Sequence, residues 1–249
     1  MSALAPWPYP RLCAHRGAGK LAPENTLAAF RRGHAFGYRM IECDAKLSAD
    51  GVAFLLHDAT LERTTNGTGR ADALPWRELS QLDAGGWHSA PYAGEPLPTL
   101  AAVARWCRSN DVALNIEIKP VPGRERETGA AIALDAKTLW GDAAVPPVLS
   151  SFAEAALEGA RLAVPDLPRA WLVERIPTDW RERAAALGCI ALDVKHTELD
   201  EARVREIRGI GLRLATWTAN DPARVRELRA WQVDTVITDA VDIVAATPT

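Results

Sequence analysis

Apolar and polar residues alternate one by one along several short stretches of the chain. Residues 39–45 and 112–118 show this alternation, which is typical of strands with two different faces. Between such stretches, apolar residues recur at helical spacing, as Leu27 and Phe30 do before a possible helix end at Gly37. Strand patterns that alternate with helix patterns indicate a parallel sheet with helical crossovers.

The number of these units predicts the fold class. Eight units in 249 residues match a (βα)₈ TIM barrel, and we expect one such domain over residues 1–249. A helix is expected after each strand, and the last helix is short. An open doubly wound sheet is the alternative, but no G-x-G-x-x-G fingerprint supports it. The predicted strands are 11–15, 39–45, 112–118, 145–150, 169–173, 189–193, 212–217 and 235–238.

Residues 59–98 differ from the segments around them. They contain turn signatures such as T-N-G-T-G and P-Y-A-G-E-P, without a sustained period. About forty residues are too many for an ordinary connection in a compact domain. We therefore predict a small insertion between the second strand and its helix, and with the preceding hairpin it covers residues 46–98.

The second strand carries two acidic residues on one face. Glu42 and Asp44 are two residues apart, so a strand points both carboxylates the same way. The turn signature Asp50-Gly51 then folds the chain back and places His57 opposite Cys43 and Asp44. A divalent cation would relieve the repulsion between the two acids. An edge hairpin with solvated acids explains the same residues equally well.

The barrel prediction favours a functional site over that plain hairpin. Active sites of this fold lie at the C-terminal ends of the strands. Polar residues gather at those positions on several predicted strands, and His57 returns to the same rim. Unrelated structural residues would not be expected to collect there. The candidates on strand ends are His15, Glu42, Asp44, Glu117, Lys119 and Trp217.

The residue types indicate the chemistry of this site. Three carboxylates, Glu42, Asp44 and Glu117, suit Mg²⁺ or Ca²⁺ better than zinc. His15 and His57 can serve as a general acid and a general base. Arg16 and Lys119 add fixed positive charge, which suits a phosphate group. A plain Glu117–Lys119 salt bridge and a core position for Trp217 remain the simpler alternatives.

An ordered set of short motifs extends over residues 12–240. Together they resemble the glycerophosphodiester phosphodiesterase family of cytoplasmic bacterial type. The motifs are His15-Arg16-Gly17, Pro23-Glu24-Asn25-Thr26, Glu42-x-Asp44, His57-Asp58, Glu62-Arg63-Thr64-Thr65-Asn66-Gly67-Thr68-Gly69, Glu117-Ile118-Lys119, Ser150-Ser151-Phe152, Trp217-Thr218 and Thr238-Asp239.

This resemblance implies an activity and a role for each candidate residue. It implies a barrel with an insertion after the second strand and metal-dependent hydrolysis of glycerophosphodiesters to sn-glycerol 3-phosphate and an alcohol. The implied metal ligands are Glu42, Asp44 and Glu117, and the implied acid–base pair is His15 and His57. Arg16 and Lys119 are then expected to contact phosphate, and Trp217 to lie along the glycerol pocket.

Two other functions are compatible with the sequence. A lysophospholipase D or cyclising lyase acting on acyl-bearing phospholipids would need an apolar channel, which the insertion could supply. A non-catalytic phosphate-binding module would be expected to lack part of the metal or histidine set, and this chain lacks none of it.

Composition limits the partners and the compartment. A net charge of −3 without a basic cluster gives no reason to expect nucleic-acid binding. We expect no secretory signal and no membrane span, because no apolar run is long enough. Four scattered cysteines favour a reducing compartment, so a cytoplasmic location is expected. The oligomeric state, the head-group alcohol and the order of the acid and base roles stay open.

Overall fold

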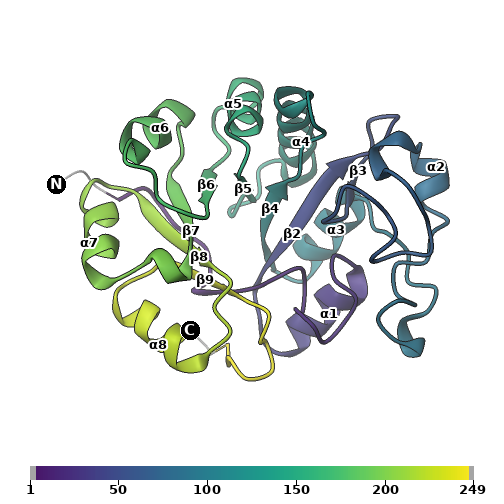
Figure 1. The fold of residues 1–249 in the computed structure, drawn as a ribbon, viewed down its shortest axis with the longest axis horizontal. Helices are drawn as coiled ribbons and strands as arrows, with labels where there is room; N and C mark the ends of the chain where they lie inside the picture. Colours follow the sequence, from purple (N-terminus) through teal and green to yellow (C-terminus); the bar gives the residue numbers. More distant parts are fainter. Residues whose placement is uncertain (1–3, 247–249) are drawn as a thin grey trace.

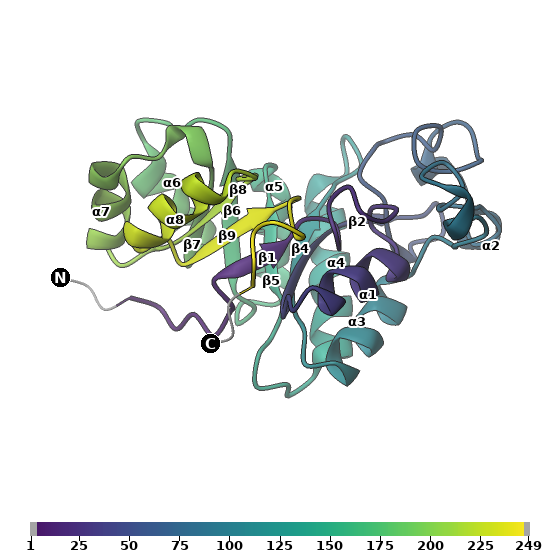
Figure 2. The same cartoon turned by 90° about the horizontal axis from the view of Figure 1, so that it is seen from below.

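A computed structural model describes residues 4–246, and its parallel strands form a closed ring surrounded by helices (Figures 1 and 2). The predicted TIM barrel is confirmed. Each strand pairs with its neighbours in parallel, and pairing of the first strand with both the second and the last closes the ring. Within residues 4–246 the eight barrel strands are β1 (Leu12–Ala14), β2 (Met40–Leu47), β4 (Ala113–Ile118), β5 (Val148–Ser151), β6 (Arg169–Val173), β7 (Ala191–Lys195), β8 (Arg213–Trp217) and β9 (Thr235–Thr238).

Helices cover the outer face of the ring. Side-chain caps begin several of them, because Thr26, Thr99 and Asp221 each accept a hydrogen bond from a backbone N–H in the first turn. The major helices are α1 (Leu27–Ala35), α3 (Leu100–Ser109), α4 (Glu125–Trp140), α5 (Glu154–Ala163), α6 (Trp180–Leu187), α7 (Glu201–Gly209) and α8 (Pro222–Ala230). The prediction of a short helix after the last strand is wrong, because turns follow β9 instead.

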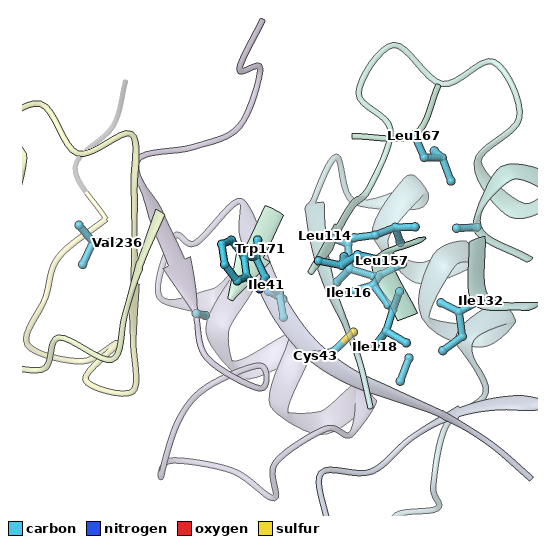
Figure 3. Close-up of a cluster of buried hydrophobic side chains, with 14 of the residues drawn as sticks. Ile41, Cys43, Leu114, Ile116, Ile118, Ile132, Leu157, Leu167, Trp171 and Val236 are labelled. Carbon is cyan, nitrogen blue, oxygen red and sulfur yellow. The ribbon is translucent and has the colours of Figure 1, made fainter. Parts of the chain in front are cut away.

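The two faces of the strands have different surroundings. Outward residues such as Ile116 and Ile118 lie with Ile132 of α4 and Leu157 of α5 in the main hydrophobic core (Figure 3). A second apolar cluster combines Tyr9, which precedes β1, with strand residues that mostly lie near the strand starts, namely Cys13, Met40, Val148, Ala170, Ala191 and Ile237. This cluster fills the N-terminal end of the barrel, so the polar inward residues come together at the opposite end.

The segment after β2 leaves the ring and extends beyond the barrel (Figure 1). Strand β3 (Ala53–Leu55) pairs antiparallel with β2, and the remaining elements are η1 (Ala71–Ala73), α2 (Trp76–Leu79) and η2 (Ala90–Tyr92). A separate apolar cluster, which includes Phe54, Leu61 and Leu79, supports this segment. The proposed limits of the insertion, 46–98, and the single domain over 1–249 stay predictions.

Helix α1 packs closely against the loop that follows β1. A Cβ added at Gly33 would overlap the carbonyl oxygen of Gly17, whereas one added at Gly209 would meet nothing within 4 Å. The glycine in α1 is therefore required by close packing. The loop that it supports carries His15 and Arg16.

We expect Gly33→Ala to destabilise the protein and Gly209→Ala to leave it unchanged or slightly more stable. Alanine improves helix propensity by up to ~1 kcal/mol at either position. At position 33 the overlap outweighs this gain, and overpacking costs about 1–3 kcal/mol. Urea unfolding of both variants gives the comparison, and equal stability of the two would contradict this account of α1.

Candidate active site

Three acidic side chains from neighbouring strands meet at the C-terminal end of the barrel. Glu42 and Asp44 lie on β2, Glu117 lies on β4, and Asp44 and Glu117 are paired in the register of the two strands. Each residue offers a carboxylate oxygen, and the three atoms lie within 4.8 Å of one another. All three residues are buried, with at most 8% of their surface exposed. The structure thus brings together the three predicted metal ligands.

Burial and mutual repulsion set the protonation of this cluster. Burial raises the pKa of Glu42 to about 8, and the charge of Asp44 adds to the rise. The same two causes raise the pKa of Glu117 to about 7. Burial would also raise the pKa of Asp44, but Lys119 and Arg16 lower it to about 2. In the absence of a cation, Asp44 holds its charge while the two glutamates resist ionisation.

The counter-charges of Asp44 come from the predicted phosphate-binding residues. Lys119 Nζ lies 2.6 Å from Glu117 Oε1 and 3.3 Å from Asp44 Oδ1. Arg16 Nε lies 3.3 Å from Asp44 Oδ2. Asn25 forms two hydrogen bonds with Asp44. Its Nδ2 donates to Asp44 Oδ2, and its Oδ1 accepts from the Asp44 backbone N–H. The Glu117–Lys119 ion pair considered from the sequence is therefore present.

His15 follows β1 and is held by the carboxylate of Asp239, the residue that follows the last strand of the ring. Its Nδ1 lies 2.6 Å from Asp239 Oδ1, and its Nε2 lies 3.8 Å from Glu42 Oε2. Burial would lower the pKa of this imidazole, but the hydrogen bond with Asp239 and the charge of Glu42 raise it above its usual value. The neighbouring Arg16 has a φ of 50°, a left-handed conformation that is uncommon without glycine, and its N–H donates to Glu42.

His57 reaches the same rim from the hairpin. The pairing of Ala45 with Leu55 sets the predicted register, and Leu56 N donates to Asp44 O. The Nδ1 atom of His57 lies 2.7 Å from Asp58 Oδ1. Burial lowers the pKa of His57, and Lys119 and Arg16 lower it further, although Asp44 opposes them.

Arg63 of the insertion connects the two sides of this rim. Its guanidinium donates to both carboxylate oxygens of Asp58 and to both of Glu24. Glu24 also accepts from Arg16 at 2.8 Å. A continuous chain of ion pairs therefore connects the partner of His57 to Arg16 and Asp44.

A cavity of about 260 Å³ opens among these groups. Both histidines, Arg16 and Lys119 line it, together with Glu42 and Glu117. Trp217 also lines it, packing edge to face against Phe152 with ring centroids 5.4 Å apart. All the predicted site residues except Asp44 line the cavity, and Asp44 contacts two of the lining residues, Arg16 and Lys119.

The carboxylate cluster has the donors that a hard divalent cation requires. Within residues 4–246, Glu42 Oε1 and Asp44 Oδ1 are buried and accept no hydrogen bond. Oxygen donors from three carboxylates match the preferences of Mg²⁺ or Ca²⁺. A cation would satisfy both oxygens and remove the repulsion within the cluster.

Several supporting residues were not predicted from the sequence. Asp58 and Asp239 position the two imidazoles, and Phe152 packs against Trp217. All three belong to motifs of the resemblance, but a motif does not indicate which side chain contacts which. Glu24 also supports this rim, since it accepts hydrogen bonds from Arg16 and Arg63.

The fold and this rim together are typical of a TIM-barrel enzyme, with a carboxylate cluster that could hold a cation. A family model described as the glycerophosphoryl diester phosphodiesterase family matches residues 15–243. A glycerophosphodiester phosphodiesterase of Caldanaerobacter subterraneus is 32% identical, and the match covers 91% of this chain and 92% of that protein. A second such enzyme, from Bacillus subtilis, is 28% identical, with 92% and 83% covered.

Solved structures similar to this one are also phosphodiesterases. A phosphodiesterase of Oleispira antarctica, in complex with the product sn-glycerol 3-phosphate, superposes with a TM-score of 0.90 and 35% identity over 95% of both chains. A glycerophosphodiester phosphodiesterase of Agrobacterium tumefaciens gives a TM-score of 0.79 at 29% identity over 96% of this chain and all of the other. The chain belongs to the glycerophosphoryl diester phosphodiesterase family, and the predicted enzyme class is confirmed.

One further observation concerns membranes. Among residues 4–246, no helix combines the length and the apolar character that a membrane crossing needs. The predicted cytoplasmic location stays a prediction.

We expect the cation-free protein to lose stability relative to Glu42→Gln as the pH rises from about 5 to about 8. The pKa of Glu42 is about 8 in the folded chain against 4.5 without its surroundings. Over this interval the unfolded chain binds fewer protons than the folded chain, so the free energy of unfolding falls. Thermal unfolding in chelator at several pH values measures this difference, and parallel curves would contradict it.

When a cation is added, we expect the wild type to become more stable than Glu42→Gln. Mg²⁺ or Ca²⁺ at about 100 times its Kd would add about 2.7 kcal/mol to the stability of the wild type. Glu42→Gln loses a ligand, so it should gain little at the same concentration. Glu182→Gln, an exposed change on α6, is the control and should respond as the wild type does.

Proposed function

We propose that the protein hydrolyses glycerophosphodiesters to sn-glycerol 3-phosphate and an alcohol by general acid–base catalysis with His15 and His57. The observation that carries this proposal is the arrangement of the two imidazoles. Each is held at Nδ1 by an aspartate, and both line one cavity beside the carboxylate cluster. The glycerol 3-phosphate bound to the Oleispira antarctica relative supports the same product and a small-molecule substrate.

Glu42, Asp44 and Glu117 would hold the divalent cation, for which we propose Mg²⁺ or Ca²⁺. When bound, the cation supplies positive charge that stabilises the developing charge on the phosphate. Arg16 and Lys119 are positioned to bind the phosphate oxygens, since both line the cavity and both carry fixed charge. The cation would take over the neutralisation of the carboxylates and release these two side chains for the substrate.

The two histidines divide the proton transfers between them. The Nδ1 of each ring is engaged by its aspartate, so Nε2 is the atom that can exchange a proton with the substrate. One histidine accepts the proton of the attacking hydroxyl, and the other donates a proton to the departing alcohol. The attacking hydroxyl is water or the 2-hydroxyl of the glycerol, which would first give a cyclic phosphate.

The cavity supports a small substrate. A volume of about 260 Å³ lies just below the range of ~300–1,000 Å³ that is usual for small-molecule sites. Trp217 offers an indole face along which the glycerol carbons can lie. The alternative activity on acyl-bearing phospholipids stays a prediction, and lysophosphatidylcholine tests it against glycerophosphocholine.

We expect His15→Ala and His57→Ala each to lower kcat by ~10²–10⁴-fold, because each removes an acid or a base. His34→Ala is the matched control, since His34 lies on α1 and packs against Trp106 away from the cavity. Release of glycerol 3-phosphate from glycerophosphocholine measures all three, with EDTA to show the need for a cation.

Near-normal turnover in either active-site variant would remove that histidine from the mechanism. Incorporation of oxygen-18 from water, followed over time with a search for the cyclic phosphate, separates the two routes of attack. No release of glycerol 3-phosphate by the wild type, at any cation concentration, would overturn the proposed function.

A further inference from the structure

Asp193 is a buried acidic residue that the proposed reaction does not use. It lies on β7, is fully buried at 0% exposure, and lines the same cavity as the two histidines. Among the contacts of residues 4–246, neither of its carboxylate oxygens has a hydrogen-bond partner. A buried carboxyl without partners is costly, because burial removes its hydration and no protein group replaces it.

Asp193 lies apart from the carboxylate cluster. In the closed ring, β7 is four strands away from β2 in either direction, so the two strands face each other across the barrel. The group of acidic residues able to share a cation contains Glu42, Asp44 and Glu117, without Asp193. The cavity is therefore bounded by the carboxylate cluster on one side and by Asp193 on the other.

The strand neighbours of Asp193 are apolar. Its register partners on the adjacent strands are Leu172 and Ala215, and Ile237 of β9 also lines the cavity. The indole N–H of Trp217 donates to the backbone oxygen of Asp193 at 3.3 Å, which holds the ring near this wall. The cavity is also lined by Glu174, Ser150 and Asn115, so a ligand there meets further polar groups beside these apolar side chains.

Charge decides which part of a glycerophosphodiester can approach this wall. The phosphate is an anion and is attracted toward Arg16 and Lys119, which leaves the wall formed by β7 to the rest of the substrate. The neutral hydroxyls of the glycerol can approach, and the terminal hydroxyl is the one farthest from the phosphate. A carboxylate accepts a hydrogen bond from a hydroxyl, and a carboxylic acid donates one, so the contact suits either form.

We propose that Asp193 binds the terminal hydroxyl of the glycerol moiety and so selects glycerol diesters over diesters of simpler alcohols. This inference rests on the proposed function and adds a specificity-determining residue to it. Glycerol would lie with its carbons against Trp217 and its far hydroxyl on Asp193.

The test compares two substrates that differ only in this hydroxyl. Glycerophosphocholine is one, and the other is the same diester with hydrogen in place of the terminal hydroxyl. The second compound keeps the 2-hydroxyl, so either route of attack remains open. The enzymes are the wild type with its cation, Asp193→Leu, Asp193→Asn and the surface control Asp142→Leu.

We expect the wild type and Asp142→Leu to prefer glycerophosphocholine by about 10–100-fold in kcat/KM, the range for a hydrogen bond to a charged group. In Asp193→Leu the preference should fall below about threefold. We expect kcat/KM to fall on glycerophosphocholine and to stay the same on the deoxy analogue. Asp193→Asn has a side chain of the same shape that can still form hydrogen bonds, so this variant should retain part of the preference.

Three results would overturn the proposal. The first is a wild type that does not discriminate between the two diesters. The second is equal loss on both substrates in the Asp193 variants, which indicates a structural role. The third is an unchanged preference accompanied by weaker cation binding in calorimetry, which assigns Asp193 to the cation site. A wild type inactive on glycerophosphocholine and on every other glycerophosphodiester would instead refute the proposed function itself.

Discussion

Repulsion among three buried carboxylates is the constraint on which the rest of this site depends. The sheet register brings Asp44 beside Glu117, and the strand period points Glu42 the same way, so the backbone itself creates the conflict. Lys119, Arg16 and Asn25 stabilise one member of the group, while the two glutamates keep raised pKa values. A site with this imbalance attracts a cation, and it loses much of its internal strain when the cation binds.

Ion pairs extend from this centre to the two imidazoles. Arg63 contacts both Asp58 and Glu24, and Glu24 contacts Arg16, so the partner of His57 and the guanidinium of Arg16 share one network. Asp239, which directly follows the last strand of the ring, holds His15. The two imidazoles are thereby positioned by residues from three separate parts of the chain, which a rigid closed barrel brings together.

Local patterns were sufficient to predict the barrel and the residues on its strand ends. The alternation around Glu42 and around Glu117 gives the face of each side chain, and Asp50-Gly51 gives the register of His57, because these features depend on a few consecutive residues. Contacts between distant segments could not be predicted in this way. Asp239 meets His15 only because the ring closes between β1 and β9, and Arg63 meets Glu24 only because the insertion folds back. Similarly, nothing in the sequence after β9 distinguished turns from a short helix.

The hairpin that carries His57 gives the enzyme two levels of stability. His15 follows a strand of the ring, whereas His57 follows the hairpin strand β3, whose Ala53 and Leu55 pack in the main core and whose Phe54 packs in the smaller cluster of the outer segment. Ion pairs of Arg63 with Glu24 and Asp58 connect this outer segment to the rim. Segments held by small clusters and exposed ion pairs open locally at a lower free energy than the core around them. Warming or high salt would therefore loosen the segment beyond β3 and displace His57 while the barrel is still folded. Loss of turnover and loss of tertiary structure would then be separate events in this protein.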